Sequence, residues 1–350
     1  MPGLGMFFAR STYRLFLRGI SFKREAQLSL ALGHDLPGAV RVEAESSGPN
    51  DKDKLSNLGK SKRERSYSAS MVDSGLWRFS LAGVALKFSL LRIAERFTLP
   101  AADPYGGDWI VKLPDTQYLE VPENEFGMMS LAAAVGIDVP QIDLVEREQL
   151  PELPDHFWPN QSRLAFAIKR FDRGHGRVAI HMEDFAQVRG KWPPEKYESS
   201  FETVASICYR KHDMQALIEF TRRMIFNVLI GNGDAHLKNW TLLYADGKKP
   251  HLSPAYDLVS TIPYIASDDI GLKWRRSKRF GAINLAGFDA LANKLGARDI
   301  ALSDIARDTV ERVCRTWAER SELLIQSSST RQSISKHLSL QADRLLSKSR

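Results

Sequence analysis

The sequence has few cysteines and no long apolar run. Its two cysteines, Cys208 and Cys314, are too few for a disulfide framework, and they are not spaced as metal ligands. We expect both to pack as small apolar side chains in a reducing cytoplasm. No apolar segment approaches the ~20 residues that a membrane-spanning helix needs, so no membrane partner is predicted.

A glycine-rich phosphate loop is also lacking. The ordered region is expected to begin near Trp77, where FSLAGVALKFSLL predicts two strands joined by a turn at Ala82-Gly83. One glycine is a much weaker indication of phosphate binding than G-x-G-x-x-G, and an ordinary hairpin explains it equally well.

Length and charge set broader bounds. A chain of 350 residues that is 43% apolar can bury a substantial core, in one large or two ordinary domains. The net charge of +7 favours an anionic partner, which could be a nucleotide, a nucleic acid or a protein that binds nucleic acid.

Four segments are predicted along the chain. Residues 1–43 are expected to be an extension or the remnant of a further N-terminal subdomain, most of which is missing. They begin with a basic stretch typical of a transit peptide, an amphipathic arm or sequence upstream of the true start, followed by a strand pair turning at Pro37-Gly38. Residues 44–76 contain almost no large apolar groups and are expected to form a flexible linker. Residues 77–168 and 169–350 are expected to form a small and a large lobe.

The most informative stretch runs from residue 231 to residue 260. Before it, Leu217, Phe220, Met224 and Val228 fall on one stripe of a predicted helix that ends at Gly231-Asn232-Gly233. After it, the apolar segments 240–243 and 252–259 predict a β-hairpin that turns at Asp246-Gly247.

Polar residues flank this hairpin at both ends. Asp234 and Asn239 precede it and Asp257 follows it, so three oxygen ligands are expected at one end, beside Lys238. Such ligands suit Mg²⁺ and a polyphosphate, and the five-residue spacing from Asp234 to Asn239 is that of a protein-kinase catalytic loop. Polar residues that merely cap turns are the alternative explanation.

The segments GNGDAHLKN and LSPAYDLVS resemble the catalytic loop and metal-binding segment of HipA-like serine/threonine kinases from bacterial toxin–antitoxin modules. The resemblance implies an α+β, two-lobed kinase fold with a small β-rich N-lobe and a mainly helical C-lobe. It implies that Asp234 accepts the proton of the substrate hydroxyl and that Asn239 and Asp257 bind Mg²⁺. It also implies that Lys238 lies near the transferred phosphoryl group. His236 is counted among the catalytic residues, and its expected role is to hold the loop in shape.

The resemblance extends to the small lobe. SLAGVALK is similar to the family's phosphate loop, which implies nucleotide contacts from Ala82, Gly83, Val84 and Lys87, with Ala85 in place of the usual Gln. Ser80 matches the serine on which such kinases phosphorylate themselves.

Further residues complete the predicted ATP site. Lys112 in WIVKLP matches the ATP-binding lysine, and Glu125, at the start of a predicted helix ending at Gly136, is its expected ion-pair partner. The strand 164–168 leads into a hinge, where Lys169, Phe171 and Asp172 are expected to meet the adenine.

The implied activity is transfer of the γ-phosphoryl group of Mg-ATP to a protein Ser or Thr, with growth arrest as the outcome. Aminoacyl-tRNA synthetases are among the implied targets, and a small helix-turn-helix antitoxin is the implied partner, with DNA reached only through that complex. The basic run 273–279 near the expected substrate entrance could meet an acidic protein, phosphate or DNA, or could simply be solvated.

Two other functions remain open. G-D-x-H-x-x-N also occurs in the catalytic loops of aminoglycoside- and choline-type kinases, so a small-molecule phosphotransferase is one alternative. An inactive kinase acting as a DNA-bound co-repressor is the other, encouraged by Ala85 and by the shortened N-terminal region.

Overall fold

The computed structural model describes residues 37–39, 87–100, 106–115, 117–151, 153, 157–159 and 162–347. The predictions for Ser80, for the loop residues Ala82 to Ala85 and for the linker 44–76 lie outside these residues. Of the predicted N-terminal strand pair only the turn is described, with Gly38 at a φ of +77°.

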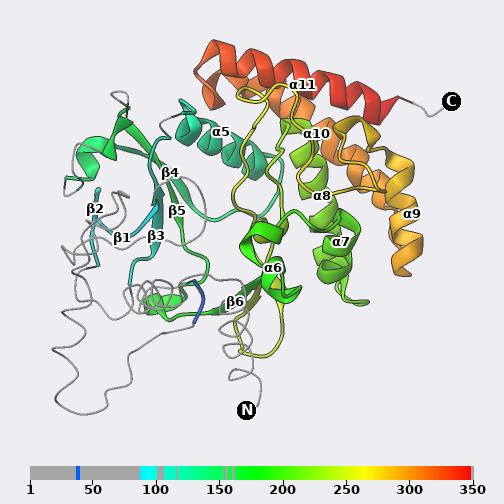
Figure 1. Ribbon diagram of the computed structural model, residues 1–350, viewed down its shortest axis with the longest axis horizontal. Coiled ribbons are helices and arrows are strands. Elements are labelled where there is room, and N and C mark those ends of the chain that lie inside the picture. The colour runs from blue at the N-terminus through cyan, green and yellow to red at the C-terminus, as the bar shows by residue number, and fades with distance from the viewer. Residues whose placement is uncertain are drawn as a thin grey trace.

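The small lobe is built on a five-stranded antiparallel sheet (Figure 1). Its strands follow the order β2-β1-β3-β5-β4, with bounds β1 Lys87–Ile93, β2 Arg96–Thr98, β3 Trp109–Lys112, β4 Ile142–Glu146 and β5 Leu164–Lys169. The register places Lys87 of β1 opposite Lys112 of β3, so the two lysines emerge on the same face. The other face carries Phe88, Leu90 and Val111 into a separate apolar cluster.

Helix α5 (Val121–Ala134) lies between this sheet and the large lobe. Pro122 stands in its first turn, where a missing N–H costs nothing, and Gly136 follows its end at a φ of +86°. A Cβ on Gly127 would lie 2.4 Å from the carbonyl oxygen of Leu324, so glycine permits the close approach of α5 to the C-terminal helices.

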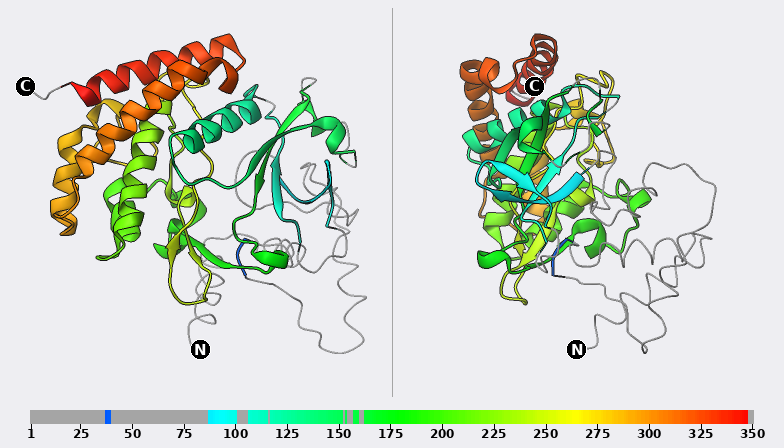
Figure 2. Two further views of the ribbon diagram at one scale, coloured as in Figure 1. Left: turned by 180° about the vertical axis from the view of Figure 1, so that it is seen from behind. Right: turned by 90° about the vertical axis from the view of Figure 1, so that its left-hand side faces the viewer.

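The large lobe is mainly helical (Figure 2). It contains α7 (Phe201–Tyr209), α8 (Met214–Ile230), α9 (Leu285–Leu295), α10 (Leu302–Leu324) and α11 (Ser328–Leu346). The stripe predicted for α8 is confirmed, since Leu217, Phe220, Met224 and Val228 are all buried. The residues Ala306, Val310, Val313 and Trp317 of α10 are buried as well, so this helix also packs by one apolar face.

A three-stranded sheet carries the predicted hairpin. Strands β6 (His181–Asp184), β7 (Thr241–Tyr244) and β8 (His251–Leu252) pair in that order, and α6 (Phe185–Val188) follows β6. The turn at Asp246-Gly247 is confirmed, with Gly247 at a φ of +73°. The predicted strand through Val259 is wrong: β8 ends at Leu252, because Pro254 has no N–H to donate to a ladder.

The architecture is therefore α+β and two-lobed, as the sequence predicts. The main apolar cluster joins α5, α7, α8, α10 and α11. Within the described residues, no helix is long and apolar enough to cross a membrane.

Candidate active site

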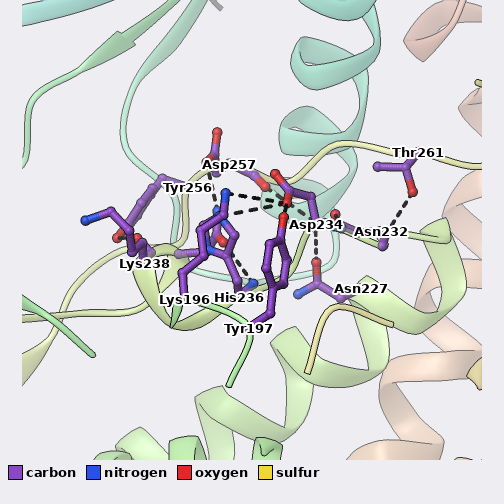
Figure 3. Close-up of polar contacts among 12 residues, drawn as sticks. Lys196, Tyr197, Asn227, Asn232, Asp234, His236, Lys238, Tyr256, Asp257 and Thr261 are labelled. Carbon is purple, nitrogen blue, oxygen red and sulfur yellow. Dashed lines mark hydrogen bonds and ion pairs between the residues drawn. The ribbon is translucent and has the colours of Figure 1, made fainter. Parts of the chain in front are cut away.

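The loop between α8 and β7 is held in shape by side chains of its own sequence (Figure 3). Helix α8 ends at Gly231, at a φ of +67°, and a Cβ there would lie 2.2 Å from Cγ1 of Ile262. Asn232 then accepts a 3.0 Å hydrogen bond from the N–H of Asp234 and donates to Asn227 at 2.7 Å. The position of Asp234 is therefore set from the end of the buried helix.

Gly233 lets a second segment approach the loop. A Cβ at this position would lie 1.9 Å from Oδ2 of Asp268. The N–H of Gly233 donates to Oγ1 of Thr261 at 2.9 Å, and the Thr261 hydroxyl in turn contacts Asp268. A side chain at position 233 would therefore displace the Asp268 carboxylate.

Charged side chains from three elements meet between the lobes. The Lys112 ammonium from β3 lies 2.5 Å from Oε1 of Glu125 on α5, and it also contacts the Asp257 carboxylate. Although burial alone would lower the pKa of Lys112, the two carboxylates outweigh it and hold the pKa above its usual value. Burial raises the pKa of Glu125, and Lys112 opposes that effect. Lys112 and Glu125 thus form the predicted ion pair.

Asp257 lies beside Asn239, as the spacing predicts. Asn239 Nδ2 donates to Oδ2 of Asp257 at 2.8 Å, and Oδ1 of Asn239 accepts from the N–H of His236 at 3.0 Å. Burial would raise the pKa of Asp257, but the Lys112 ammonium outweighs it and holds the pKa well below the usual range. The backbone of Asp257 has a φ of 60°, a strained conformation of the kind that occurs at functional sites.

This donor set fits Mg²⁺ bound together with phosphate. In the part of the chain that the structure describes, no three His, Cys, Asp or Glu side chains are grouped closely enough to hold a metal on their own. One carboxylate and one amide suffice when phosphate oxygens and water supply the remaining ligands, which is the usual arrangement for Mg²⁺. Binding would require the Asn239 amide to turn, since its nitrogen now faces Asp257.

Lys87 brings a second ammonium group to this site. Burial, and then the nearby Lys112 charge, lower the pKa of Lys87. No carboxylate of the described residues lies within 4 Å of its ammonium, whereas Lys112 contacts two. An anionic ligand would favour the charged form of Lys87, as expected for a phosphate contact.

Asp234 is the most open of the predicted catalytic groups, with 48% of its side chain exposed. Its Oδ1 accepts a hydrogen bond from the Tyr197 hydroxyl, and it lies 3.9 Å from the Lys196 ammonium and 3.8 Å from Nε2 of His236. Sequence reasoning missed Lys196 and Tyr197, which precede the loop by almost 40 residues.

His236 is buried beneath this carboxylate. Burial lowers the pKa of His236, which keeps the ring neutral near pH 7 despite the nearby Asp234. Its ring packs edge-on against Tyr197, with the ring centroids 5.2 Å apart. These contacts agree with a residue that shapes the loop.

The Lys238 side chain pairs with Asp184, and its place near the phosphoryl group stays a prediction. Its ammonium is 2.6 Å from Oδ2 of Asp184, which also caps α6, and Figure 3 shows it directed away from Asp234. The Tyr256 hydroxyl donates to the Lys238 carbonyl at 2.7 Å. In this structure the Lys238 side chain therefore joins the loop to the small three-stranded sheet.

The hinge residues have contacts of their own. Lys169 ends β5 with its side chain exposed, and the Phe171 ring lies 5.3 Å from that of Tyr256. The buried Asp172 carboxylate pairs with Arg170 and Arg173, and its Oδ2 accepts the N–H of Gly38 at 2.7 Å. Adenine contacts by this segment stay a prediction.

The chain is similar in sequence and in fold to proteins that are already known. The family model described as HipA-like C-terminal domain matches residues 79–317. The chain belongs to the HipA-like family. It is 41% identical over 314 residues to the protein named "Putative kinase Y4dM" from Sinorhizobium fredii, covering 87% of this chain and 73% of that one.

Two further comparisons involve Shewanella oneidensis. The chain is 30% identical over 211 residues to the protein named serine/threonine-protein kinase toxin HipA, covering 53% of this chain and 44% of that protein. A solved structure of HipA with HipB and operator DNA superposes with a TM-score of 0.67 at 22% identity, covering 91% of this chain and 78% of that one. The latter establishes the fold.

Proposed function

We propose that this protein is an ATP-dependent protein kinase that transfers the γ-phosphoryl group of Mg-ATP to a Ser or Thr hydroxyl. The observation that carries the proposal is the meeting of Lys112 with Glu125 and Asp257, from three elements and two lobes. Phosphoryl transfer in protein kinases requires a small-lobe lysine paired with a helix glutamate, and an aspartate that holds Mg²⁺.

In this proposal the chain's own residues bind the phosphates and position the acceptor. Lys112 and Lys87 neutralise phosphate charge from the small lobe, and the Asp234 carboxylate accepts the proton of the acceptor hydroxyl. Asn239 and Asp257 would hold Mg²⁺, which would supply further positive charge. Phosphorylation of Ser80 on the same chain would add negative charge to the phosphate loop and oppose nucleotide binding.

The biological setting is part of the same proposal. The protein acts in the bacterial cytoplasm as a toxin whose substrate is a protein, with aminoacyl-tRNA synthetases as candidates. A small helix-turn-helix antitoxin is its proposed partner, supported by the complex of Shewanella oneidensis HipA with HipB and operator DNA.

Labelling of a bacterial lysate with [γ-³²P]ATP tests the activity. The native chain should label one dominant protein band, and the Asp234→Gln variant should label none while still binding nucleotide. Labelling of small molecules without any protein band would favour a small-molecule phosphotransferase. Absence of Mg-ATP binding in a thermal-shift assay would favour the inactive co-repressor.

A further inference from the structure

A tyrosine hydroxyl already contacts the carboxylate that the proposed kinase uses as its base. The Tyr197 hydroxyl donates a hydrogen bond to Oδ1 of Asp234, and the Lys196 ammonium lies 3.9 Å from the same oxygen. The contacts that the described residues make with this carboxylate all involve Oδ1, and Figure 3 shows Tyr197, Lys196 and His236 around Asp234. One carboxylate oxygen is therefore engaged within the protein and the other is open to an acceptor.

The Tyr197 ring is held in place from several sides. It packs edge-on against His236, with an interplanar angle of 74°, and the ammonium groups of Lys196 and Lys278 lie 4.9 and 5.7 Å from its centroid. Cations over an aromatic face are attracted to it. The phenol is thus a fixed group rather than a loosely placed side chain.

The backbone around Tyr197 is fixed too. The N–H of Leu237, in the catalytic loop, donates to the Lys196 carbonyl at 3.2 Å. Four residues beyond Tyr197, the N–H of Phe201 donates to the Lys273 carbonyl at 2.9 Å. The segment that carries Tyr197 is thereby joined to the catalytic loop on one side and to residue 273 on the other.

A half-exposed carboxylate on a loop would otherwise turn freely about its side-chain bonds. Burial and the hydrogen bond to Asp234 raise the pKa of Tyr197, so its hydroxyl remains a donor at neutral pH. A base whose orientation is fixed by a third group is a recurring device in catalytic sites.

We infer that Tyr197 is a positioning residue for the proposed phosphoryl transfer. Its hydroxyl holds Oδ1 of Asp234 so that Oδ2 faces the acceptor hydroxyl, whose proton Asp234 takes as the phosphoryl group is transferred. This inference rests on the proposed kinase activity and adds to it a residue that does not itself touch substrate.

Tyr197→Phe tests this role, because it removes the hydroxyl and keeps the ring. A hydrogen bond to a charged group is worth about 1.5–3 kcal/mol, which corresponds to roughly a 10- to 150-fold loss in kcat. The KM for ATP and the thermal midpoint should stay close to those of the native chain. Tyr244→Phe is the matched control, since the Tyr244 hydroxyl also donates to a carboxylate, Glu183 at 2.6 Å, outside the site.

The readouts are the initial rate of ³²P incorporation into lysate protein and the release of inorganic phosphate from [γ-³²P]ATP. A loss of transfer in Tyr197→Phe but not in Tyr244→Phe supports the inference. Unchanged transfer in Tyr197→Phe overturns it. Faster phosphate release or faster transfer overturns it in another way, because the hydroxyl would then be occupying the acceptor's place.

Mass spectrometry of the native chain after incubation with Mg-ATP gives an independent check. Phosphate on Tyr197 would show that the phenol is itself an acceptor, against the positioning role. A native chain that transfers phosphate to no lysate protein would remove the proposed kinase activity and this inference with it. Transfer by the native chain with equal transfer by the variant would remove only the inference.

Discussion

Replacing Lys112 with methionine should leave two carboxylates facing each other without the cation that now lies between them. The side chains of Glu125 and Asp257 are 4% and 30% exposed, so neither charge is fully solvated. Removing one partner of a buried ion pair costs about 3–5 kcal/mol, because the remaining charge stays out of water. The nearby Lys87 offsets part of this loss. We therefore expect the free energy of unfolding near pH 8 to fall by about 3 kcal/mol.

The loss of stability in Lys112→Met should become smaller as the pH falls. Burial already raises the pKa of Glu125, and Lys112→Met removes the charge that opposes this rise. In the variant the folded-state pKa of Glu125 rises further above its unfolded value, so the free energy of unfolding falls as the pH rises from the unfolded pKa to the folded pKa. As the pH falls, protonation of Glu125 relieves its repulsion from Asp257. The free energies of unfolding of Lys112→Met and the native chain should therefore converge between pH 8 and pH 5.

Urea denaturation followed by tryptophan fluorescence measures both effects. The set comprises the native chain, Lys112→Met, Glu125→Gln and the double variant, with Lys294→Met on the exposed face of α9 as the control. The double variant should regain most of the lost stability, since only one carboxylate remains. Equal urea midpoints for Lys112→Met and the native chain at pH 8 would refute the reasoning, and so would a double variant no more stable than Lys112→Met.

Further substitutions distinguish residues that act in the transfer step from residues that support the fold. Asp234→Asn should lower the transfer rate by about 10²–10⁴-fold with nucleotide affinity within about twofold of native, measured by kinetics and calorimetry. Lys238→Met and Asp184→Ala should each lower the thermal midpoint, while the transfer rate per folded molecule stays near the native rate. A loss of transfer without a loss of stability would instead favour a role for Lys238 at the phosphoryl group. Gly233→Ala should abolish transfer and lower the thermal midpoint, because its Cβ would overlap the Asp268 carboxylate; adding Asp268→Ala should recover part of both.

The elements around the site could be predicted where one short-range signal dominates. The apolar stripe of α8 ends at a glycine whose position admits no Cβ, and the Asp246-Gly247 turn follows from local backbone preference. The spacing of Asp234 and Asn239 was visible because both lie within one loop.

The remaining features depend on contacts between distant segments. The pairing of Lys238 with Asp184 and of Tyr197 with Asp234 spans 54 and 37 residues. A single sequence carries no signal for such pairs, since in the sequence each partner alone is an ordinary polar residue. The shortness of β8 was missed because Leu252 to Val259 is apolar enough for a strand, although Pro254 cannot donate to one.

Calorimetric titration with a non-hydrolysable ATP analogue tests the central claim most directly, namely that Lys112, Asp257 and Asn239 together hold Mg-ATP. The native chain should bind the analogue only weakly without Mg²⁺ and at least about tenfold more tightly with it, a gain of about 1.4 kcal/mol. Asp257→Asn should lose the Mg²⁺-dependent gain, and Asp246→Asn, at the exposed hairpin turn, should keep it. Binding by Asp257→Asn that still strengthens with Mg²⁺, or no binding by the native chain at millimolar analogue, would contradict the account.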